Sequence, residues 1–502
     1  MTTNNPLSHD AMGRSYGLGL LAILALWTLY RAVLLATDQS LSLYVDEAYY
    51  WVWSQAPDFG YYSKPPMIAW SIGGVTALLG DSQLGVKSLA LFVYPFTAVA
   101  FFLLARYLFD VRVAFFSTLA FITLPGVTLS SVIASTDVLL FFFWTLSLYA
   151  FVRAVNENTW RYWVLLGLAG GLGLLSKYTM GIFAVSVLIA LCTVPAYRQH
   201  LLNYRLYLAA VLAFLLFLPN IFWNIQHRFP TLQHTYEISR LENTGLHWGE
   251  LGEFLAGQFS VMGPVGFFVF LALLAGLLIP RGPVVPSQGP QHTGLLLSFS
   301  LPFLLIISLQ GLLGRANANW AAPTYVAATL WVISRLLQAG RTKWLTAVFA
   351  ANILLGLAVF HYHTIVQVLG IELTRQTDPY KRVKGWEAFA YEVTTLLNAH
   401  PKTKLLSGSR SVLSHVAFYS QPHRLDGVSW NPESQIRHQF DLVTNMADHI
   451  GEDFIYVTQK TDVSDLQSRF DSVAFLKEIH IPIHRDFAIT YQAYLARGFK
   501  GY

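Results

Sequence analysis

Residues 43–70 read LYVDEAYYWVWSQAPDFGYYSKPPMIAW and lie between two apolar stretches of the chain. This segment places two adjacent carboxylates, Asp46 and Glu47, before a run of aromatic residues, and then Lys64 before two prolines. The preceding stretch, GLGLLAILALWTLYRAVLLA at residues 17–36, has the length of about 20 apolar residues that a helix needs to cross a bilayer core of about 30 Å. A polar loop between such stretches indicates a helical membrane protein.

The composition of the whole chain supports this interpretation. Of its 502 residues, 54% are hydrophobic and 12% are charged, whereas soluble globular chains carry roughly 25% charged residues. A further apolar segment at 65–80 is short and opens with two prolines. We therefore expect it to lie in the membrane interface or to form a re-entrant segment, and not to span the membrane. The hydropathy pattern predicts about eleven spanning helices, near residues 17–36, 84–108, 112–126, 138–155, 162–176, 180–196, 206–223, 258–280, 294–313, 320–338 and 343–363.

Basic residues orient the predicted helices. By the positive-inside rule, the connections that carry them face the cytoplasm, and the loop at 43–70 then faces outside with residues 127–137, 224–257 and 314–320. The formal net charge of +5 fits basic membrane flanks, and no basic run with interleaved aromatics indicates nucleic acid as a partner. The orienting residues are Arg14, Arg106, Arg112, Arg153, Arg161, Arg198, Arg205, Arg281, Arg335, Arg341 and Lys343.

After about residue 370 the sequence becomes polar and charged. Helix-like and strand-like segments then alternate, in the order GWEAFAYEVTTLLNAH, TKLLSG, RSVLSHVAFYS, DFIYVTQ and VSDLQSRF. We predict a transmembrane domain over residues 1–369 and a soluble α/β domain over 370–502, which an odd number of spans places outside the cytoplasm. The single cysteine, Cys192, excludes disulfides within the chain.

Asp46 and Glu47 begin a predicted amphipathic helix over residues 46–55. In a structural interpretation Asp46 is the N-cap, and Glu47 lies near the positive end of the helix dipole. In a catalytic interpretation a carboxylate at the membrane surface is a general base that deprotonates an acceptor hydroxyl attacking a sugar carbon. The two are compatible, because a capped helix holds a base rigidly.

Lys64 has two interpretations as well. It either extends toward phospholipid headgroups or, fixed by the two prolines, pairs with a lipid-linked phosphate and stabilises it as a leaving group. The neighbouring aromatic residues are expected to form an interfacial belt, with one or two of them open to sugar stacking. They are Tyr49, Tyr50, Trp51, Trp53, Tyr61 and Tyr62.

Three further positions carry polar groups at predicted outer helix ends. Asp137, in VIASTDVLLFFFW, is either a helix cap or a functional acid. Lys177 and Tyr178, in GLLSKYTMGIF, lie at a turn where the positive-inside rule does not favour a lysine, which indicates an anionic partner.

A second outward basic turn is LLGRANANWAAP, with Arg315 ahead of Asn317 and of Asn319, a candidate N-cap. His361 and His363 are too few for a metal site, and no Gly-rich phosphate loop follows a strand. We therefore predict no metal ligands and no cofactor, with a divalent cation left open.

The segments DEAYYWVWS, GYYSKPPMIAW, STDVLLFFFWTLSLY, LLSKYTMGIF and ANANWAAPTY run in one order over residues 17–330. In this they resemble the membrane glycosyltransferases of the C-type fold, and more narrowly the protein O-mannosyltransferases and bacterial lipid A aminoarabinose transferases (a glycosyltransferase family 39-like group). The first-loop segments are the specific part of the resemblance.

The resemblance implies transfer of a sugar from a polyprenyl-phosphate donor, with inversion, to a glycolipid such as lipid A, a polysaccharide or a protein. The reaction would occur on the outer face of a bacterial inner membrane, among membrane lipids. On this basis we predict Asp46, Glu47 and Asp137 as catalytic residues and Lys64, Lys177 and Arg315 as ligands of the donor phosphate. The predicted substrate-binding residues are Tyr49, Tyr61, Tyr62, Tyr178 and Asn317.

Two positions depart from the family pattern. Ala48 stands where some relatives have an arginine, and Ser63 stands where an acidic residue often precedes the lysine, which argues against a zinc site of the aminoarabinose type. The alternatives are a transporter or flippase of lipid-linked saccharides, for which no internal repeat is visible, and a scaffold without catalysis.

Overall fold

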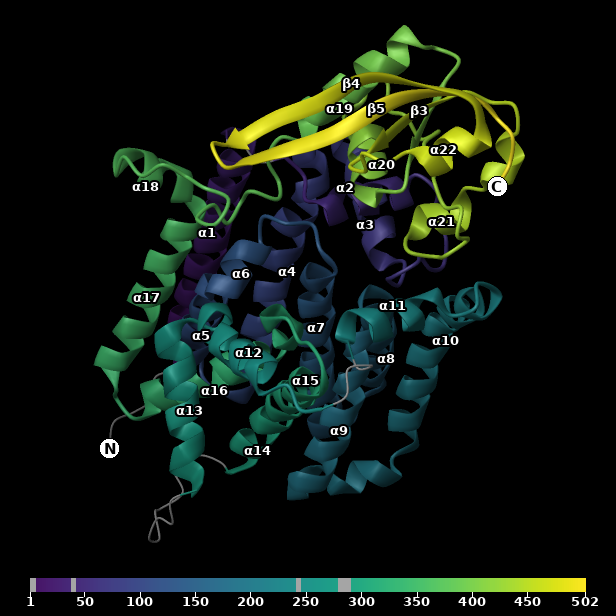
Figure 1. Ribbon diagram of the computed structural model, residues 1–502. Helices are drawn as coiled ribbons and strands as arrows, with labels where there is room; N and C mark the ends of the chain where they lie inside the picture. Colours follow the sequence, from purple (N-terminus) through teal and green to yellow (C-terminus); the bar gives the residue numbers. More distant parts are fainter. Residues whose placement is uncertain (1–5, 38–41, 241–244, 279–289) are drawn as a thin grey trace. The chain divides into compact units, whose positions relative to one another are not determined.

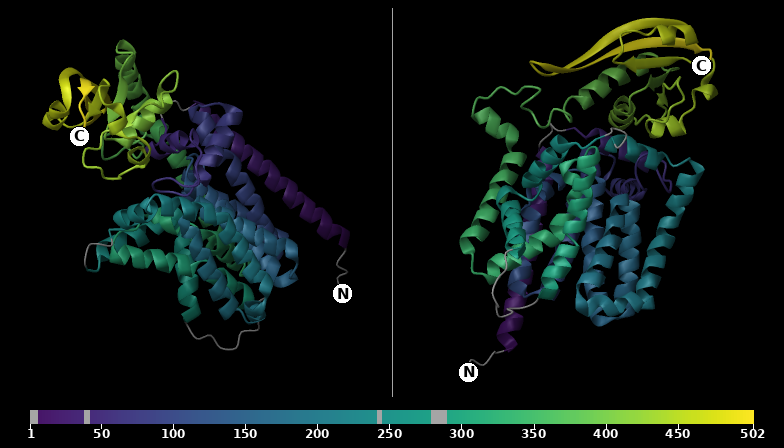
Figure 2. Two further views of the ribbon diagram at one scale, coloured as in Figure 1. Left: turned by 90° about the vertical axis from the view of Figure 1, so that its right-hand side faces the viewer. Right: turned by 60° about the horizontal axis from the view of Figure 1, so that its bottom comes forward.

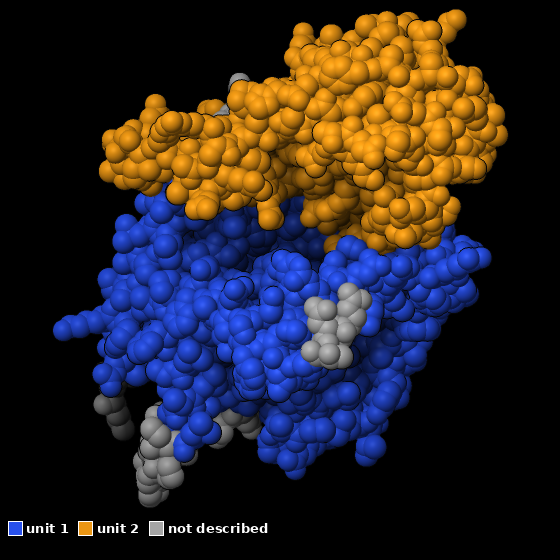
Figure 3. Space-filling view, viewed as in Figure 1, with its two compact units in different colours: residues 1–34, 87–362 blue, residues 35–86, 363–502 orange. Residues whose placement is uncertain are grey.

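The computed structural model describes residues 6–37, 42–240, 245–278 and 290–502 of the chain. Arg281, one of the orienting residues, lies outside these ranges. The chain divides into two compact units (Figure 3): unit 1 consists of residues 1–34 and 87–362, and unit 2 of residues 35–86 and 363–502. Unit 2 therefore contains the first predicted outer loop as well as the carboxy-terminal segment.

Unit 1 is a bundle whose long helices run alongside one another (Figures 1 and 2). Its core is built from apolar side chains of many helices, among them the fully buried Phe121, Trp144 and Phe303. The helices are α1 (Pro6–Thr37), α4 (Gln83–Leu108), α5 (Val111–Thr123), α6 (Pro125–Ser130), α7 (Thr136–Glu157), α8 (Trp160–Ser176), α9 (Ile182–Thr193), α10 (Tyr204–Gln226), α11 (Pro230–Ser239), α12 (Trp248–Val261), α13 (Pro264–Leu278), α14 (Pro290–Ser298), α15 (Leu301–Leu313), α16 (Thr324–Gln338) and α17 (Thr342–Phe360), with the short 3₁₀ helices η1 (Tyr178–Gly181), η2 (Pro195–Leu202) and η3 (Ala318–Ala321).

Six helices of the described chain are long and apolar enough to cross a membrane, or up to eight if each of two bent pairs is one span. This confirms a polytopic helical membrane protein, while the larger number of spans stays a prediction. The segment predicted as a span at 258–280 is formed by parts of two helices, α12 and α13, which meet at a bend of 114°, and its crossing of the membrane stays a prediction. Gly263 lies at this bend with φ of +88°, in the left-handed region that favours glycine, and a Cβ there would lie 2.1 Å from Asn352 Oδ1.

Two glycines allow α8 and α10 to approach closely. A Cβ on Gly167 would lie 2.7 Å from the carbonyl oxygen of Ala209, and one on Gly171 would lie 2.8 Å from Leu216 Cβ. The two glycines are four positions apart and hence on one helix face, the spacing that brings membrane helices together. This packing holds the end of α8, and with it Lys177 and Tyr178, beside α10.

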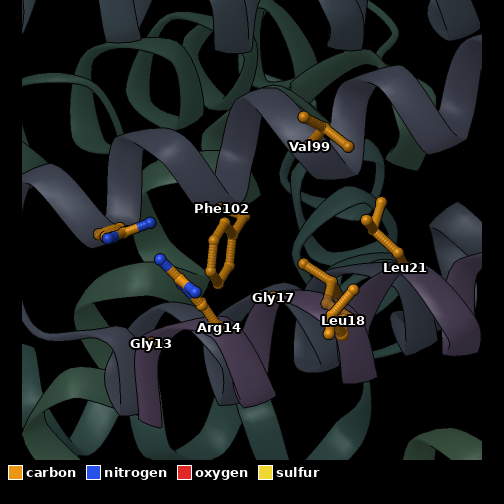
Figure 4. A pocket seen from close by; sticks show the side chains of 9 residues that line it. Gly13, Arg14, Gly17, Leu18, Leu21, Val99 and Phe102 are labelled. Carbon is orange, nitrogen blue, oxygen red and sulfur yellow. The ribbon is translucent and has the colours of Figure 1, made fainter. Parts of the chain in front are cut away.

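A pocket of about 590 Å³ lies between α1 and α4 (Figure 4). Arg14 of α1 and Arg106 of α4 both line it, together with apolar side chains such as Leu18 and Phe102. Both arginines belong to the set that orients the predicted helices. The fold therefore brings the basic ends of these two helices together, as one membrane flank requires.

Unit 2 contains a five-stranded sheet of order β2-β1-β3-β5-β4. β1 pairs in parallel with β2 and β3, β5 pairs antiparallel with β3 and β4, and β4 and β5 form a long hairpin (Figure 1). The elements are α2 (Val45–Ser54), α3 (Met67–Leu79), α18 (Tyr362–Val368), α19 (Trp386–Ala399), β1 (Lys404–Ser407), α20 (Arg410–Tyr419), β2 (Val428–Ser429), α21 (Gln439–Val443), η4 (Met446–His449), β3 (Phe454–Thr458), α22 (Ser464–Arg469), β4 (Phe470–His484) and β5 (Phe487–Phe499). The predicted α/β character is confirmed, although the sequence did not reveal the hairpin.

The first loop folds onto the carboxy-terminal segment within unit 2. The backbone N–H of Leu43 donates to Tyr419 Oη at 2.8 Å, and that of Tyr62 donates to Gln439 Oε1 at 2.7 Å. Trp51 packs edge-on against Phe418 with ring centroids 5.0 Å apart. The predicted aromatic belt is therefore wrong: all six of its side chains are buried in unit 2.

Candidate active site

The acidic pair lies at the start of α2, and its two carboxylates have different surroundings. Glu47 is fully buried, and its Oε2 accepts a hydrogen bond from the backbone N–H of Tyr44 at 2.9 Å. Tyr44, not Asp46, is the N-cap of the helix, so the predicted cap is wrong. Burial and this bond favour a structural role for Glu47, which the sequence predicts to be catalytic.

Asp46, by contrast, is accessible. Its side chain is 56% exposed, and Oδ1 accepts a hydrogen bond from Arg410 Nη1 at 2.9 Å. Arg410 begins α20, and its guanidinium carbon lies 5.3 Å from the centroid of the Tyr49 ring. Burial alone would lower the pKa of Arg410, but the adjacent Asp46 carboxylate and tyrosines outweigh it and raise that pKa above its usual value.

Sequence reasoning missed Arg410. It follows the Ser-Gly-Ser turn between β1 and α20, and no local pattern relates that turn to the first loop. A basic residue at a strand-to-helix turn was the available signal, but its carboxylate partner could be found only in three dimensions.

Lys64 lies in a tight turn. The backbone N–H groups of Tyr61 and Lys64 donate to each other's carbonyl oxygens at 3.1 and 3.3 Å, and Lys64 is half-buried. Pro65 and Pro66 follow and restrict the backbone before α3 begins at Met67. The structure thus fixes the backbone of Lys64 as the sequence predicts, and its phosphate-binding role stays a prediction.

The tyrosines of the first loop are held by packing. Tyr61 stacks on Trp53 with centroids 4.7 Å apart and donates to the Trp53 carbonyl at 3.1 Å, and burial raises the pKa of Tyr61 to about 12. Tyr49 Oη accepts a hydrogen bond from the backbone N–H of Gln439, and burial raises the pKa of Tyr49 as well. Tyr62 is buried beside them. These surroundings favour a structural role over the predicted sugar contact.

In unit 1 the structure brings Asp137, Lys177 and Asn319 together. Lys177 Nζ lies 2.5 Å from Asp137 Oδ1, and Asn319 Nδ2 donates to Asp137 Oδ2 at 2.9 Å. Lys177 is thus paired with an acidic residue of the same chain, and its predicted contact with the donor phosphate stays a prediction. Neither predicted cap holds, because Ser135 is the N-cap of α7 and Asn317 that of η3.

The remaining predicted residues lie close to these three in the chain. Tyr178 Oη donates to Asn220 Oδ1 at 3.1 Å and accepts from Asn224 Nδ2 at 3.4 Å, which joins η1 to α10. Arg315 and Asn317 are exposed. Within the ranges that the structure describes, no three histidine, cysteine, aspartate or glutamate side chains are grouped as metal ligands, and we assign no metal site there.

Comparisons with known proteins agree with the predicted resemblance. A family model described as dolichyl-phosphate-mannose-protein mannosyltransferase matches residues 63–223. The lipid A galacturonosyltransferase RgtD of Rhizobium johnstonii is 35% identical over 369 residues, covering 71% of this chain and 74% of that protein. The lipopolysaccharide core galacturonosyltransferase RgtA of the same organism is 34% identical over 188 residues, covering 36% of this chain and 37% of that protein.

A solved structure has the same fold. ArnT from Cupriavidus metallidurans, bound to undecaprenyl phosphate, superimposes with a TM-score of 0.62 at 13% identity, covering 95% of this chain and 98% of that chain. The C-type fold and the enzymatic class expected from the first-loop motif are thereby confirmed. The chain belongs to the family of C-type-fold membrane glycosyltransferases that includes the lipid A galacturonosyltransferase RgtD.

Proposed function

We propose that this glycosyltransferase moves a hexosyl-type sugar from a polyprenyl-phosphate carrier to lipid A or the lipopolysaccharide core at the extracytoplasmic face of the inner membrane. The names of RgtD and RgtA support this acceptor class, and the undecaprenyl phosphate in the ArnT structure supports this donor class. The observation that carries the proposal is the accessible Asp46 carboxylate held by Arg410. Nothing in the comparisons favours the flippase alternative.

In the proposed reaction Asp46 accepts the proton of an acceptor hydroxyl. The hydroxyl oxygen forms a bond to the anomeric carbon as the bond from that carbon to the phosphate oxygen breaks, and the anomeric configuration inverts. Polyprenyl phosphate leaves with the bonding electron pair. The donor is already activated, so the protein must position the reactants, remove the proton and stabilise charge.

Arg410 has a defined role in this scheme. Its guanidinium donates to one oxygen of Asp46, which leaves the second oxygen for the acceptor hydroxyl. Lys64 is the cation that we propose for the donor phosphate. Lys177 is already paired with Asp137, so we propose that this pair, together with Asn319, fixes the local structure of unit 1 around the turn at residue 177.

The test is transfer of radiolabelled sugar from polyprenyl-phosphate donors in membranes that contain the wild type or Asp46→Asn. We expect label in an extractable glycolipid with the wild type and a loss of roughly 100-fold or more in the variant, the usual contribution of a general base. Asp426→Asn is the matched control, because Asp426 is an exposed aspartate of unit 2 outside this site. Equal transfer by Asp46→Asn would exclude Asp46 as the base, and Asp137 would be tested next.

A further inference from the structure

A polar cleft of about 270 Å³ lies within unit 2, and Tyr491 of β5 is one of the residues that line it. Its lining comes from the segments that follow the three parallel strands: Ser409 after β1, Trp430 after β2 and Gln459 after β3. Ligands of open α/β sheets bind at the carboxyl ends of parallel strands, where the connections to the next elements leave a crevice. The topology of unit 2 therefore places this cleft at a position suited to a ligand.

The lining has the chemistry of a sugar site. Trp430, Tyr456 and Tyr491 supply apolar aromatic surface, and all three are less than 10% exposed, so they are firmly held. Gln459 and Lys460 have exposed side chains at the rim and supply hydrogen-bond donors and an acceptor. Aromatic walls with a few convergent polar groups suit an uncharged or weakly charged polyhydroxylated ligand.

The charge of the cleft narrows the ligand class further. The basic residues Arg437 and Lys460 are balanced by the acidic residues Glu433 and Asp465, which also line the cleft. Arg437 is moreover occupied by Asp441, whose Oδ1 lies 3.2 Å from Arg437 Nη2. A strongly anionic ligand would need a net positive site, and an acyl chain would need an apolar one, so a saccharide fits better than either.

The cleft adjoins the candidate base through the chain itself. Ser409 lines the cleft, and the next residue, Arg410, donates to Asp46 at 2.9 Å. Gly408 also lines the cleft, and its carbonyl oxygen lies 3.3 Å from Nε2 of the buried His438. This contact helps to hold the turn between β1 and α20 in place. A saccharide in the cleft would thus contact the turn that carries the partner of Asp46.

We infer that this cleft is a binding subsite for the saccharide part of the acceptor. The assignment of the bound saccharide as the acceptor rests on the proposed function, whereas the cleft and its lining residues are features of the structure itself. The site holds the acceptor sugar beside the Ser-Gly-Ser-Arg turn, and the acyl chains lie elsewhere.

Direct binding tests the subsite. The probe is the core oligosaccharide of lipopolysaccharide, released from lipid A by mild acid and dephosphorylated so that it is only weakly charged. It is added to the full-length protein in detergent, with calorimetry and saturation-transfer NMR as readouts. The variant Gln459→Ala/Lys460→Ala removes two exposed rim groups that no core packing requires. We expect its Kd for the oligosaccharide to rise about tenfold, because each direct hydrogen bond contributes a few-fold to affinity.

The matched control is Lys402→Ala/Gln467→Ala, which removes the same two side-chain types from exposed positions outside the cleft. It should bind like the wild type. In transfer assays the rim variant should raise the KM for the acceptor and leave the KM for the donor unchanged. Equal Kd values for the wild type and the rim variant, or no binding of the oligosaccharide to the wild type, would overturn the subsite.

The two hypotheses fail in different ways. The wild type could bind the oligosaccharide more tightly than the rim variant and yet transfer no sugar. That result would refute the proposed reaction but support the saccharide-binding site. Transfer that proceeds with an unchanged acceptor KM in the rim variant would support the reaction and refute the subsite.

Discussion

At the scale of single residues, the pair Asp46–Arg410 is the most informative contact. Both side chains are more than 40% exposed, so solvent screens their attraction, and such a pair contributes about 1 kcal/mol. We expect Arg410→Gln to lower kcat roughly fivefold, the equivalent of that energy, because the carboxylate loses its fixed orientation. Arg410→Lys should recover part of the loss, and Arg424→Gln, an arginine elsewhere in unit 2, should have no effect. An unchanged kcat in Arg410→Gln would refute the positioning role.

A second residue, Asp378, links the pH of the medium to stability. Its buried carboxylate lies 2.7 Å from both Lys384 Nζ and His484 Nε2, and it accepts from the backbone N–H of Tyr380 at 2.8 Å. Burial alone would raise its pKa, but these bonds outweigh burial and hold the pKa below its usual value. Because folding depresses this pKa, the stabilisation is complete above the unfolded value of about 3.9 and is lost as the pH falls through the folded value.

As the pH is lowered from 5, we expect the unfolding temperature of the wild type to fall more steeply than that of Asp378→Asn. At pH 7 the variant should be less stable by roughly 3 kcal/mol, because Lys384 and His484 lose their anionic partner. Scanning calorimetry over a pH series measures both effects, with the exposed Asp426→Asn as control. Parallel curves for the wild type and Asp378→Asn would show that another group controls acid stability.

At the scale of elements, the contact of α8 with α10 depends on glycine. Gly167→Ala would place a methyl group 2.7 Å from the Ala209 carbonyl oxygen, so one helix must shift. Overpacking of this kind typically costs about 1–3 kcal/mol, and we expect a lower unfolding temperature together with lower activity, since α8 leads into Lys177. Gly170→Ala is a control on the same helix, because its new methyl would lie 3.6 Å from Ala213 Cβ, an ordinary contact. Equal stability of the two variants would contradict this account.

At the scale of the whole molecule, the predicted orientation places unit 2 outside the cytoplasm. The test uses Lys402→Cys in unit 2 and Lys343→Cys at the start of α17, each in a Cys192→Ala background that removes the single native thiol. We expect a membrane-impermeant maleimide to label residue 402 in intact spheroplasts and residue 343 only after permeabilisation, because the positive-inside rule assigns Lys343 to the cytoplasm. The reverse labelling pattern would refute the orientation.

The sequence by itself determined the membrane class, most helix positions, the α/β character of the carboxy-terminal segment and the family. Apolar length, basic flanks and short-range periodicity are local properties that a reader of the chain can measure directly. The first-loop motif is local as well, so Asp46 and Lys64 could be singled out without a structure. Even the bend after α12 had a local signal in the Gly-Pro pair at 263–264.

Only the tertiary structure decided which side chains face one another. Arg410 meets Asp46 across 364 positions of sequence, and Lys177 meets Asp137 across 40. An aromatic strip has the same composition whether it faces a membrane surface or a neighbouring helix, and here α20 and α21 cover it and make it core. Burial and ion pairing depend on neighbours that are distant in the chain, and local patterns carry no information about them.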